Sequence, residues 1–133
     1  MFHWIPESAV IAIHAELLAE HGGVEGITNE KLIGATLARA QQLLAYSNPA
    51  PDVFRLAAAH GFGFAKNHCF TDGNKRVALS MIDVFLEMNG YELTANEPET
   101  VTVILSLATS EIDEEELTEW IRKNSQPFDI NKE

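Results

Sequence analysis

The stretch HCFTDGNKRVALSMIDVFLEMNG, residues 68–90, decides the fold of this chain. Its second part is apolar on nearly all sides of a helix and ends at the stop signal Asn89-Gly90. A helix that is apolar all round has to be covered by other helices, so it predicts the centre of a helical bundle. Its first part is polar, which places a loop rich in chemically active side chains at the start of that helix.

Helical spacing of apolar residues predicts five more helices around this central one. Their starts are predicted at Pro6, at Thr28 or Asn29, at Asp52, at Pro98 and at Asp113. A short extended piece is expected near residues 91–93. We therefore predict an all-α fold, a single-domain six-helix bundle over residues 1–133.

Composition excludes several classes of function. With 20 Asp and Glu against 9 Lys and Arg, the net charge of −11 disfavours direct contact with nucleic acid. Outside the C-terminal end of the chain, basic residues cluster in one place only, between Lys66 and Arg76. The single cysteine, Cys69, excludes an internal disulfide and suits a reducing compartment. No apolar stretch approaches the ~20 residues of a membrane span, so we predict a cytoplasmic protein without a membrane partner.

Residues 73–76 have the composition of an anion site. The first N–H groups of a helix lack partners within it and carry a partial positive charge, so they can bind an anion directly. Gly73 permits close approach, Asn74 can donate, Lys75 supplies a mobile charge and Arg76 offers a forked pair of donors. These residue types together favour phosphate binding.

Asp72 and His68 add chemistry to this anion site. A carboxylate beside phosphates would be repelled unless a divalent cation lay between them, so Asp72 predicts a Mg²⁺ ion and a nucleotide. His68 is a candidate general base, because the neutral imidazole of a histidine can accept a proton from a hydroxyl near neutral pH. Phe70 is expected to point into the core and fix the loop that presents His68.

Taken singly, these residues also have ordinary structural roles. Asp72 is a good N-cap, His68 would more often be a hydrogen-bonded histidine, and Cys69 is best read as a packing residue. His60 lies on an apolar helix face, where a structural role is favoured. No metal-ligand spacing that we consider reliable is formed by His3, His14 and His21. The functional interpretation depends on the conjunction of seven suitable residues in nine positions.

Residues 68–76 resemble the motif of the Fic/Doc family, His-x-Phe-x-Asp/Glu-Gly/Ala-Asn-Gly/Lys-Arg, at every defined position. Lys75 is similar to the Doc, or death-on-curing, branch, where Fic enzymes carry glycine. Cys69 in place of proline and Leu79 in place of a second arginine also resemble Doc, whereas Gly73 is the choice typical of Fic. The Gly-Gly turn at 21–27 extends the resemblance, which we place over about residues 3–125.

The resemblance implies an all-α bundle and a specific activity. Doc toxins transfer the γ-phosphate of ATP to a threonine of elongation factor Tu and so block translation. In family terms His68 is the catalytic base, Asp72 holds Mg²⁺, and the phosphates are bound by Gly73, Asn74, Lys75 and Arg76. Arg76 also counts as catalytic, and Lys66 is a further cation that can face ATP.

Two alternatives stay open from the sequence. A Fic-type adenylyltransferase would use the same residues to transfer AMP, and a catalytically silent interaction module would keep only the fold. The inhibitory string Ser/Thr-x-x-x-Glu-Gly/Asn is absent, because Ser110 and Glu114 are followed by Glu115. Control is therefore expected from a Phd-like antitoxin, whose C-terminal segment folds into a groove on the toxin.

Overall fold

The computed structural model describes residues 1–128, which form six α-helices and two short strands. The helices are α1 (Glu7–His21), α2 (Glu30–Tyr46), α3 (Val53–Lys66), α4 (Asn74–Met88), α5 (Glu97–Ala108) and α6 (Glu114–Lys123). The strands are β1 (Tyr91–Leu93) and β2 (Ser125–Pro127). This confirms the all-α prediction. None of the helices within residues 1–128 combines the length and the apolar character needed to cross a membrane.

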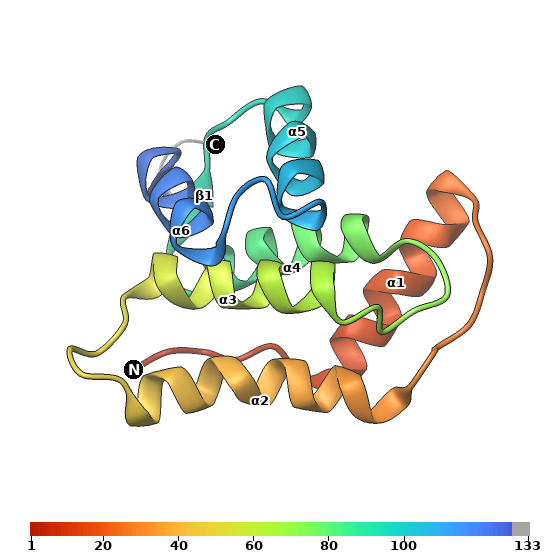
Figure 1. Cartoon of the computed structure of the whole chain (residues 1–133), viewed down its shortest axis with the longest axis horizontal. Helices are drawn as coiled ribbons and strands as arrows, with labels where there is room; N and C mark the ends of the chain where they lie inside the picture. Colours follow the sequence, from red (N-terminus) through yellow and green to blue (C-terminus); the bar gives the residue numbers. More distant parts are fainter. Residues whose placement is uncertain (129–133) are drawn as a thin grey trace.

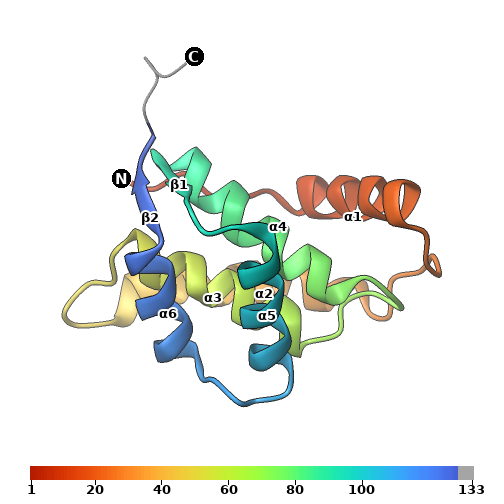
Figure 2. The ribbon, with the colours of Figure 1, turned by 90° about the horizontal axis from the view of Figure 1, so that it is seen from above.

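The central helix of the bundle is α4, as its apolar composition predicted. It packs along α3, with α2 on one side of this pair and α5 and α6 on the other (Figure 1). In the view from above, α4 runs between α1 and α5 (Figure 2). Its buried residues are Val77, Ala78, Met81, Ile82, Phe85 and Leu86. The position of α4 matters for function because its first turn carries the predicted anion site.

Polar caps set most helix starts where the sequence predicted them. The side chains of Asn29, Asp52 and Asp113 each accept a backbone N–H from the first turn of α2, α3 and α6. The α5 helix begins one residue before the predicted Pro98, because the Asn96 side chain accepts the N–H of Glu99 at 2.8 Å. The extended piece at residues 91–93 is confirmed as β1, and its antiparallel partner β2 was not predicted.

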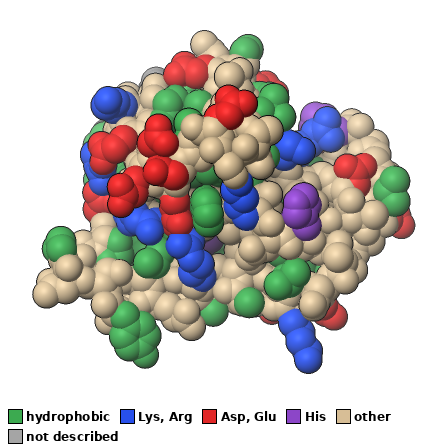
Figure 3. Space-filling model, viewed as in Figure 1, with side chains coloured by type: hydrophobic (Ala, Val, Ile, Leu, Met, Phe, Trp, Pro, Cys, Tyr) green, Lys and Arg blue, Asp and Glu red, His purple; other side chains and the backbone are tan. Residues whose placement is uncertain are grey.

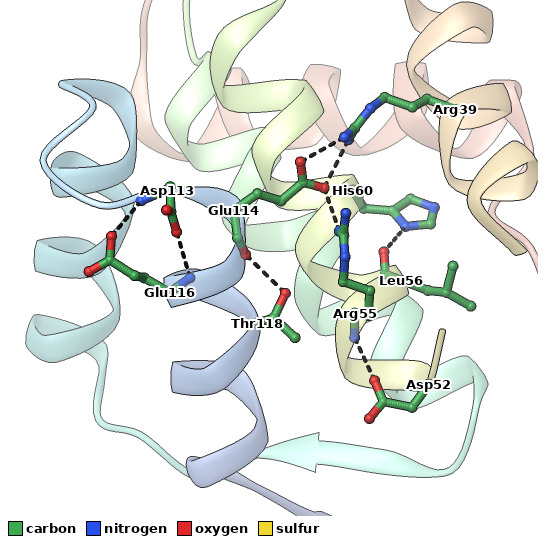
Figure 4. A network of polar contacts seen from close by, with 9 residues as sticks. All are labelled: Arg39, Asp52, Arg55, Leu56, His60, Asp113, Glu114, Glu116 and Thr118. Atoms are coloured by element: carbon green, nitrogen blue, oxygen red, sulfur yellow. Dashed lines mark hydrogen bonds and ion pairs between the residues drawn. The ribbon is translucent and has the colours of Figure 1, made fainter. Parts of the chain in front are cut away.

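A charged contact that was not predicted joins α6 to α2 and α3 through Glu114 (Figure 4). Its carboxylate accepts two hydrogen bonds from Arg39, at 2.7 and 2.9 Å, and one from Arg55 at 2.5 Å. Only 12% of the Glu114 side chain is exposed, so this network is partly shielded from water. Glu114 is the acid of the incomplete inhibitory string, and the two arginines hold it in place.

His60 is buried in α3, as its apolar surroundings predicted. Its Nδ1 donates to the Leu56 carbonyl at 2.8 Å (Figure 4), and its ring stacks on Phe85 with the ring centroids 4.5 Å apart. The Nε2 atom has no hydrogen-bond partner among residues 1–128. Burial lowers the pKa of His60 below its ordinary value, so the ring is neutral.

Candidate active site

The loop that precedes α4, residues 67–73, lies against the loop that joins α1 to α2. Thr28 N–H donates to the Cys69 carbonyl at 2.9 Å, and Thr71 N–H donates to the Gly26 carbonyl at 3.0 Å. These two bonds flank an antiparallel bridge between Ile27 and Phe70. The motif loop is therefore held by a segment more than forty residues away in the chain.

Phe70 anchors the loop in the core, which confirms the prediction from its position between polar residues. Its side chain is buried, and its ring stacks on His14 with the centroids 3.8 Å apart and the planes 12° from parallel. The Asn74 side chain closes the loop: Oδ1 accepts the Phe70 N–H at 3.0 Å and Nδ2 donates to the Phe70 carbonyl at 2.8 Å. The Asn74 amide thus shapes the loop and keeps one N–H for another partner.

His68 lies exposed on this loop with a left-handed backbone, φ 48°. Its two neighbours are both tied to Thr36 of α2. Asn67 Nδ2 donates to Thr36 Oγ1 at 2.9 Å, and the buried Cys69 Sγ lies 3.7 Å from the same oxygen. Because a non-glycine residue rarely adopts a positive φ, these anchors hold His68 in a conformation that an unsupported loop would leave.

Asp72 does not cap α4, so its N-cap interpretation was wrong. Gly73 is the capping residue, with φ 83°, and the Asp72 carboxylate instead accepts N–H groups from Val24 at 3.1 Å and from Gly73 at 2.9 Å. A Cβ atom on Gly23 would lie 2.8 Å from Asp72 Oδ2, so only glycine lets the α1–α2 loop come this close. The hydrogen bonds from Val24 and Gly73 hold the pKa of Asp72 below its ordinary value, and Asp72 is ionised at neutral pH.

A pocket of about 480 Å³ opens at the first turn of α4. It is lined by five residues of the motif, Asp72, Gly73, Asn74, Lys75 and Arg76, and by His21, Leu79, Glu97, Val101, Ile104 and Leu105. The first N–H groups of α4 have no helical partner, so they add to the positive potential of this wall. Lys, Arg and His side chains lie next to one another between α1 and α5, while acidic side chains gather over α6 (Figure 3).

Two predicted residues do not line this pocket. His68 lies on the exposed loop, four positions before Asp72, the first motif residue that lines the pocket. The Lys66 ammonium donates to Ser110 Oγ and to the Ala108 carbonyl at the end of α5. The structure therefore groups Asp72 with residues 73–76 and leaves Lys66 attached to another helix end.

The pocket continues as a groove along α4. Neighbouring hollows share Arg76 and Leu79 near the pocket, and then Ser80 and Asp83 further along the helix. One end of the groove carries cationic side chains, and the other end carries four acids, Glu16, Glu20, Asp83 and Glu87. Apolar residues of the walls come from α1 and α5, and include Leu17, Val101 and Leu105.

The sequence did not identify His14 as part of the site. His14 is buried in α1, and its Nε2 donates to the Asp72 carbonyl at 2.8 Å. One signal was present: His14 is four residues after Val10 and three before Leu17, on the face of α1 that the apolar residues define. Within residues 1–128, no three side chains of His, Cys, Asp or Glu converge as a protein-only metal site.

The chain is similar to known proteins over most of its length. Residues 4–86 match a model of the Fic/DOC family. A protein of Escherichia phage P1 named Protein kinase doc is 31% identical over 123 residues, which are 92% of this chain and 95% of that protein. A protein of Mycolicibacterium smegmatis named Toxin Doc is 35% identical over 75 residues, 56% of this chain and 58% of that protein. These relatives confirm the resemblance to the Doc branch.

Proposed function

The chain belongs to the Fic/DOC family, and from this premise we propose that it is a Doc-like toxin that transfers the γ-phosphate of ATP to a threonine or serine hydroxyl of a protein. The observation that carries the proposal is the convergence of Asp72 with residues 73–76 in one pocket at the first turn of α4. The names of the two relatives, one a kinase and the other a toxin, support it.

In this proposal the pocket binds ATP by its phosphates. Arg76 and Lys75 neutralise phosphate oxygens, and the free N–H groups of the first turn of α4 donate to them. Asn74 contributes its remaining N–H and the loop geometry that it fixes. Lys66 is a weaker candidate for binding ATP than residues 73–76, because its ammonium would have to leave Ser110 to reach the phosphates.

The Asp72 carboxylate fits a magnesium site. It is exposed and ionised, and each of its oxygens accepts one N–H, which leaves a lone pair on each for a metal. One carboxylate with phosphate oxygens and water is a common way of holding Mg²⁺. When bound, the ion neutralises charge that develops on the phosphates.

His68 is the proposed general base. Its neutral imidazole accepts the proton of the target hydroxyl, while the hydroxyl oxygen attacks the γ-phosphorus. The bond from the γ-phosphorus to the bridging oxygen breaks, and ADP leaves with that electron pair. The exposed position of His68 supports this role, because the base has to meet a hydroxyl on another protein.

The alternative is AMP transfer, which would use the same residues on the α-phosphate. Lys75 favours the γ-phosphate, since a long cationic side chain where Fic enzymes have glycine restricts close approach of the backbone. Incubating the protein and a cell lysate with ATP labelled at the α or the γ position tests this choice. We expect label from γ-labelled ATP only, and mass spectrometry should find one added phosphate. An added AMP would establish adenylylation, and no transfer of either kind would favour a silent interaction module.

We further propose elongation factor Tu as the target. A labelled band of that size in the lysate, with the phosphate on threonine, is the expected result. Modification of this factor would block translation and would place the activity in the cytoplasm. Label on another protein of the lysate would reject this target without rejecting the transferase.

The proposed partner is a Phd-like antitoxin, and the groove along α4 is its proposed docking site. Its apolar walls fit the apolar stripe of an amphipathic helix, and the acids at the far end complement basic side chains. A helix lying there would also cover Arg76. Asp83→Lys should weaken antitoxin binding and neutralisation of toxicity, whereas Glu115→Lys on the exposed face of α6 should not. Equal binding by both variants would place the antitoxin elsewhere.

A further inference from the structure

His14 makes two contacts with the active-site loop from a helix that lies far away in the chain. Its ring lies flat on Phe70, and its Nε2 donates to the Asp72 carbonyl, 58 residues along the sequence. Only 5% of His14 is exposed. A carbonyl oxygen only accepts, so Nε2 must carry the proton of this hydrogen bond.

The Asp72 carbonyl belongs to the same peptide as the Gly73 N–H, and a peptide is planar. Holding the carbonyl therefore fixes the direction of this N–H, which in turn donates to Asp72 Oδ1 at 2.9 Å. The backbone of Gly73 is in the left-handed region. Its carbonyl accepts the first hydrogen bond of α4, from the Val77 N–H at 3.0 Å. One hydrogen bond from His14 thus sets the peptide from which both the carboxylate and the first turn of α4 extend.

We propose that His14 is a positioning residue of the active site: its Nε2–H fixes the Asp72–Gly73 peptide and so aims the Asp72 carboxylate and the α4 amides at the phosphates. It touches neither ATP nor the target in this scheme. The expected effect of His14 on transfer rests on the proposed nucleotide function. The hydrogen bond from His14 to the Asp72 carbonyl can be tested without any activity.

Two substitutions separate positioning from packing. His14→Phe keeps a flat ring against Phe70 and removes the donor, whereas His14→Gln keeps an N–H donor and removes the ring. If His14 positions the loop, His14→Phe should weaken MgATP binding and lower the transfer rate about tenfold or more, as expected for a misplaced catalytic group. His14→Gln should recover most of both. The reverse order, with His14→Phe close to the parent and His14→Gln impaired, would show that His14 only fills space.

Matched controls and a second readout complete the test. His3→Phe removes an exposed histidine far along the chain from the loop and should leave MgATP binding unchanged. In the amide NMR spectrum, His14→Phe should shift the Gly73 signal and speed its hydrogen exchange, and His14→Gln should do so less. An unchanged Gly73 amide in His14→Phe would overturn the proposal.

The parent protein supplies a measurement that does not depend on the variants folding. Its ¹⁵N-labelled histidine spectrum should show His14 protonated at Nε2, and a ring with a bare Nε2 would overturn the proposal. If the parent transferred neither phosphate nor AMP, the proposed function would fail while these NMR tests of His14 still stood.

Discussion

Asp83→Asn should stabilise the protein at neutral pH and change its stability little under acid conditions. Asp83 is half-buried on α4 in the groove and has Glu87 four residues further along the same helix. Burial, and then the charge of Glu87, raise the pKa of Asp83 from 3.8 to about 6. The folded protein therefore binds a proton on Asp83 more readily than the unfolded chain does.

The sign and size of the effect follow from linkage. Between pH 3.8 and about 6 the unfolded chain loses this proton first, so the free energy of unfolding falls as pH rises through that window. Each pKa unit corresponds to ~1.4 kcal/mol, which gives at most about 3 kcal/mol. Because the side chain is only half-buried, screening by water reduces this to about 1–2 kcal/mol. Asparagine has no charge to bury and avoids the loss.

Urea unfolding of the parent and of Asp83→Asn, at about pH 4 and about pH 7.5, measures the effect. The difference between the two proteins should grow by about 1–2 kcal/mol from the lower to the higher pH. Glu115→Gln, on an exposed carboxylate of α6, is the control and should show no such growth. A difference for Asp83→Asn that is the same at both pH values would refute the reasoning.

Four further predictions follow from the same structure. His68→Ala should reduce transfer about 10²–10⁴-fold in the labelled-ATP assay with little change in melting temperature, and a variant that still arrests growth would exclude His68 as the base. Asp72→Asn should weaken Mg²⁺-dependent ATP binding in calorimetry more than it lowers stability, because asparagine still accepts one of the two N–H groups; normal ATP binding would reject the metal role. Glu114→Gln should cost about 1–3 kcal/mol in urea unfolding, since both arginines lose their charged partner, and an unchanged value would mean the network is fully screened. His60, with its pKa lowered, supports folding above pH 6.5 and less as pH falls below that value, so NMR should show it neutral while exposed histidines protonate.

Local signals explain what the sequence could predict. Caps such as Asn29 and Asp113 act within three residues of their own position, so they can be read from the sequence directly. The same holds for the central position of α4, which follows from its composition. Asp72 shows the limit of this reasoning: its residue type favours an N-cap, but Gly73 is the N-cap of α4 and the Asp72 carboxylate accepts the N–H of Val24, 48 residues away.

Contacts between distant residues explain what the sequence could not predict. Glu114 meets Arg39 across 75 residues, and His14 meets Asp72 across 58. Nothing local distinguishes these side chains from solvated charges or from packing residues, because their partners are chosen by the packing of whole helices. The motif predicts which groups carry the chemistry, and the bundle shows which contacts hold them.

The anchors of the motif loop account for the strained backbone at His68, the proposed base. His68 has a positive φ, which costs free energy in an isolated loop. Thr36 from α2 holds its two neighbours, the α1–α2 loop pairs with Phe70, and His14 from α1 holds Asp72. Each anchor comes from a different part of the fold, so the loop can adopt this conformation only when the bundle is assembled. If His68 is the base, as proposed, this anchored backbone would hold its exposed side chain in a fixed direction toward a protein target, which a flexible loop of the same sequence would not allow.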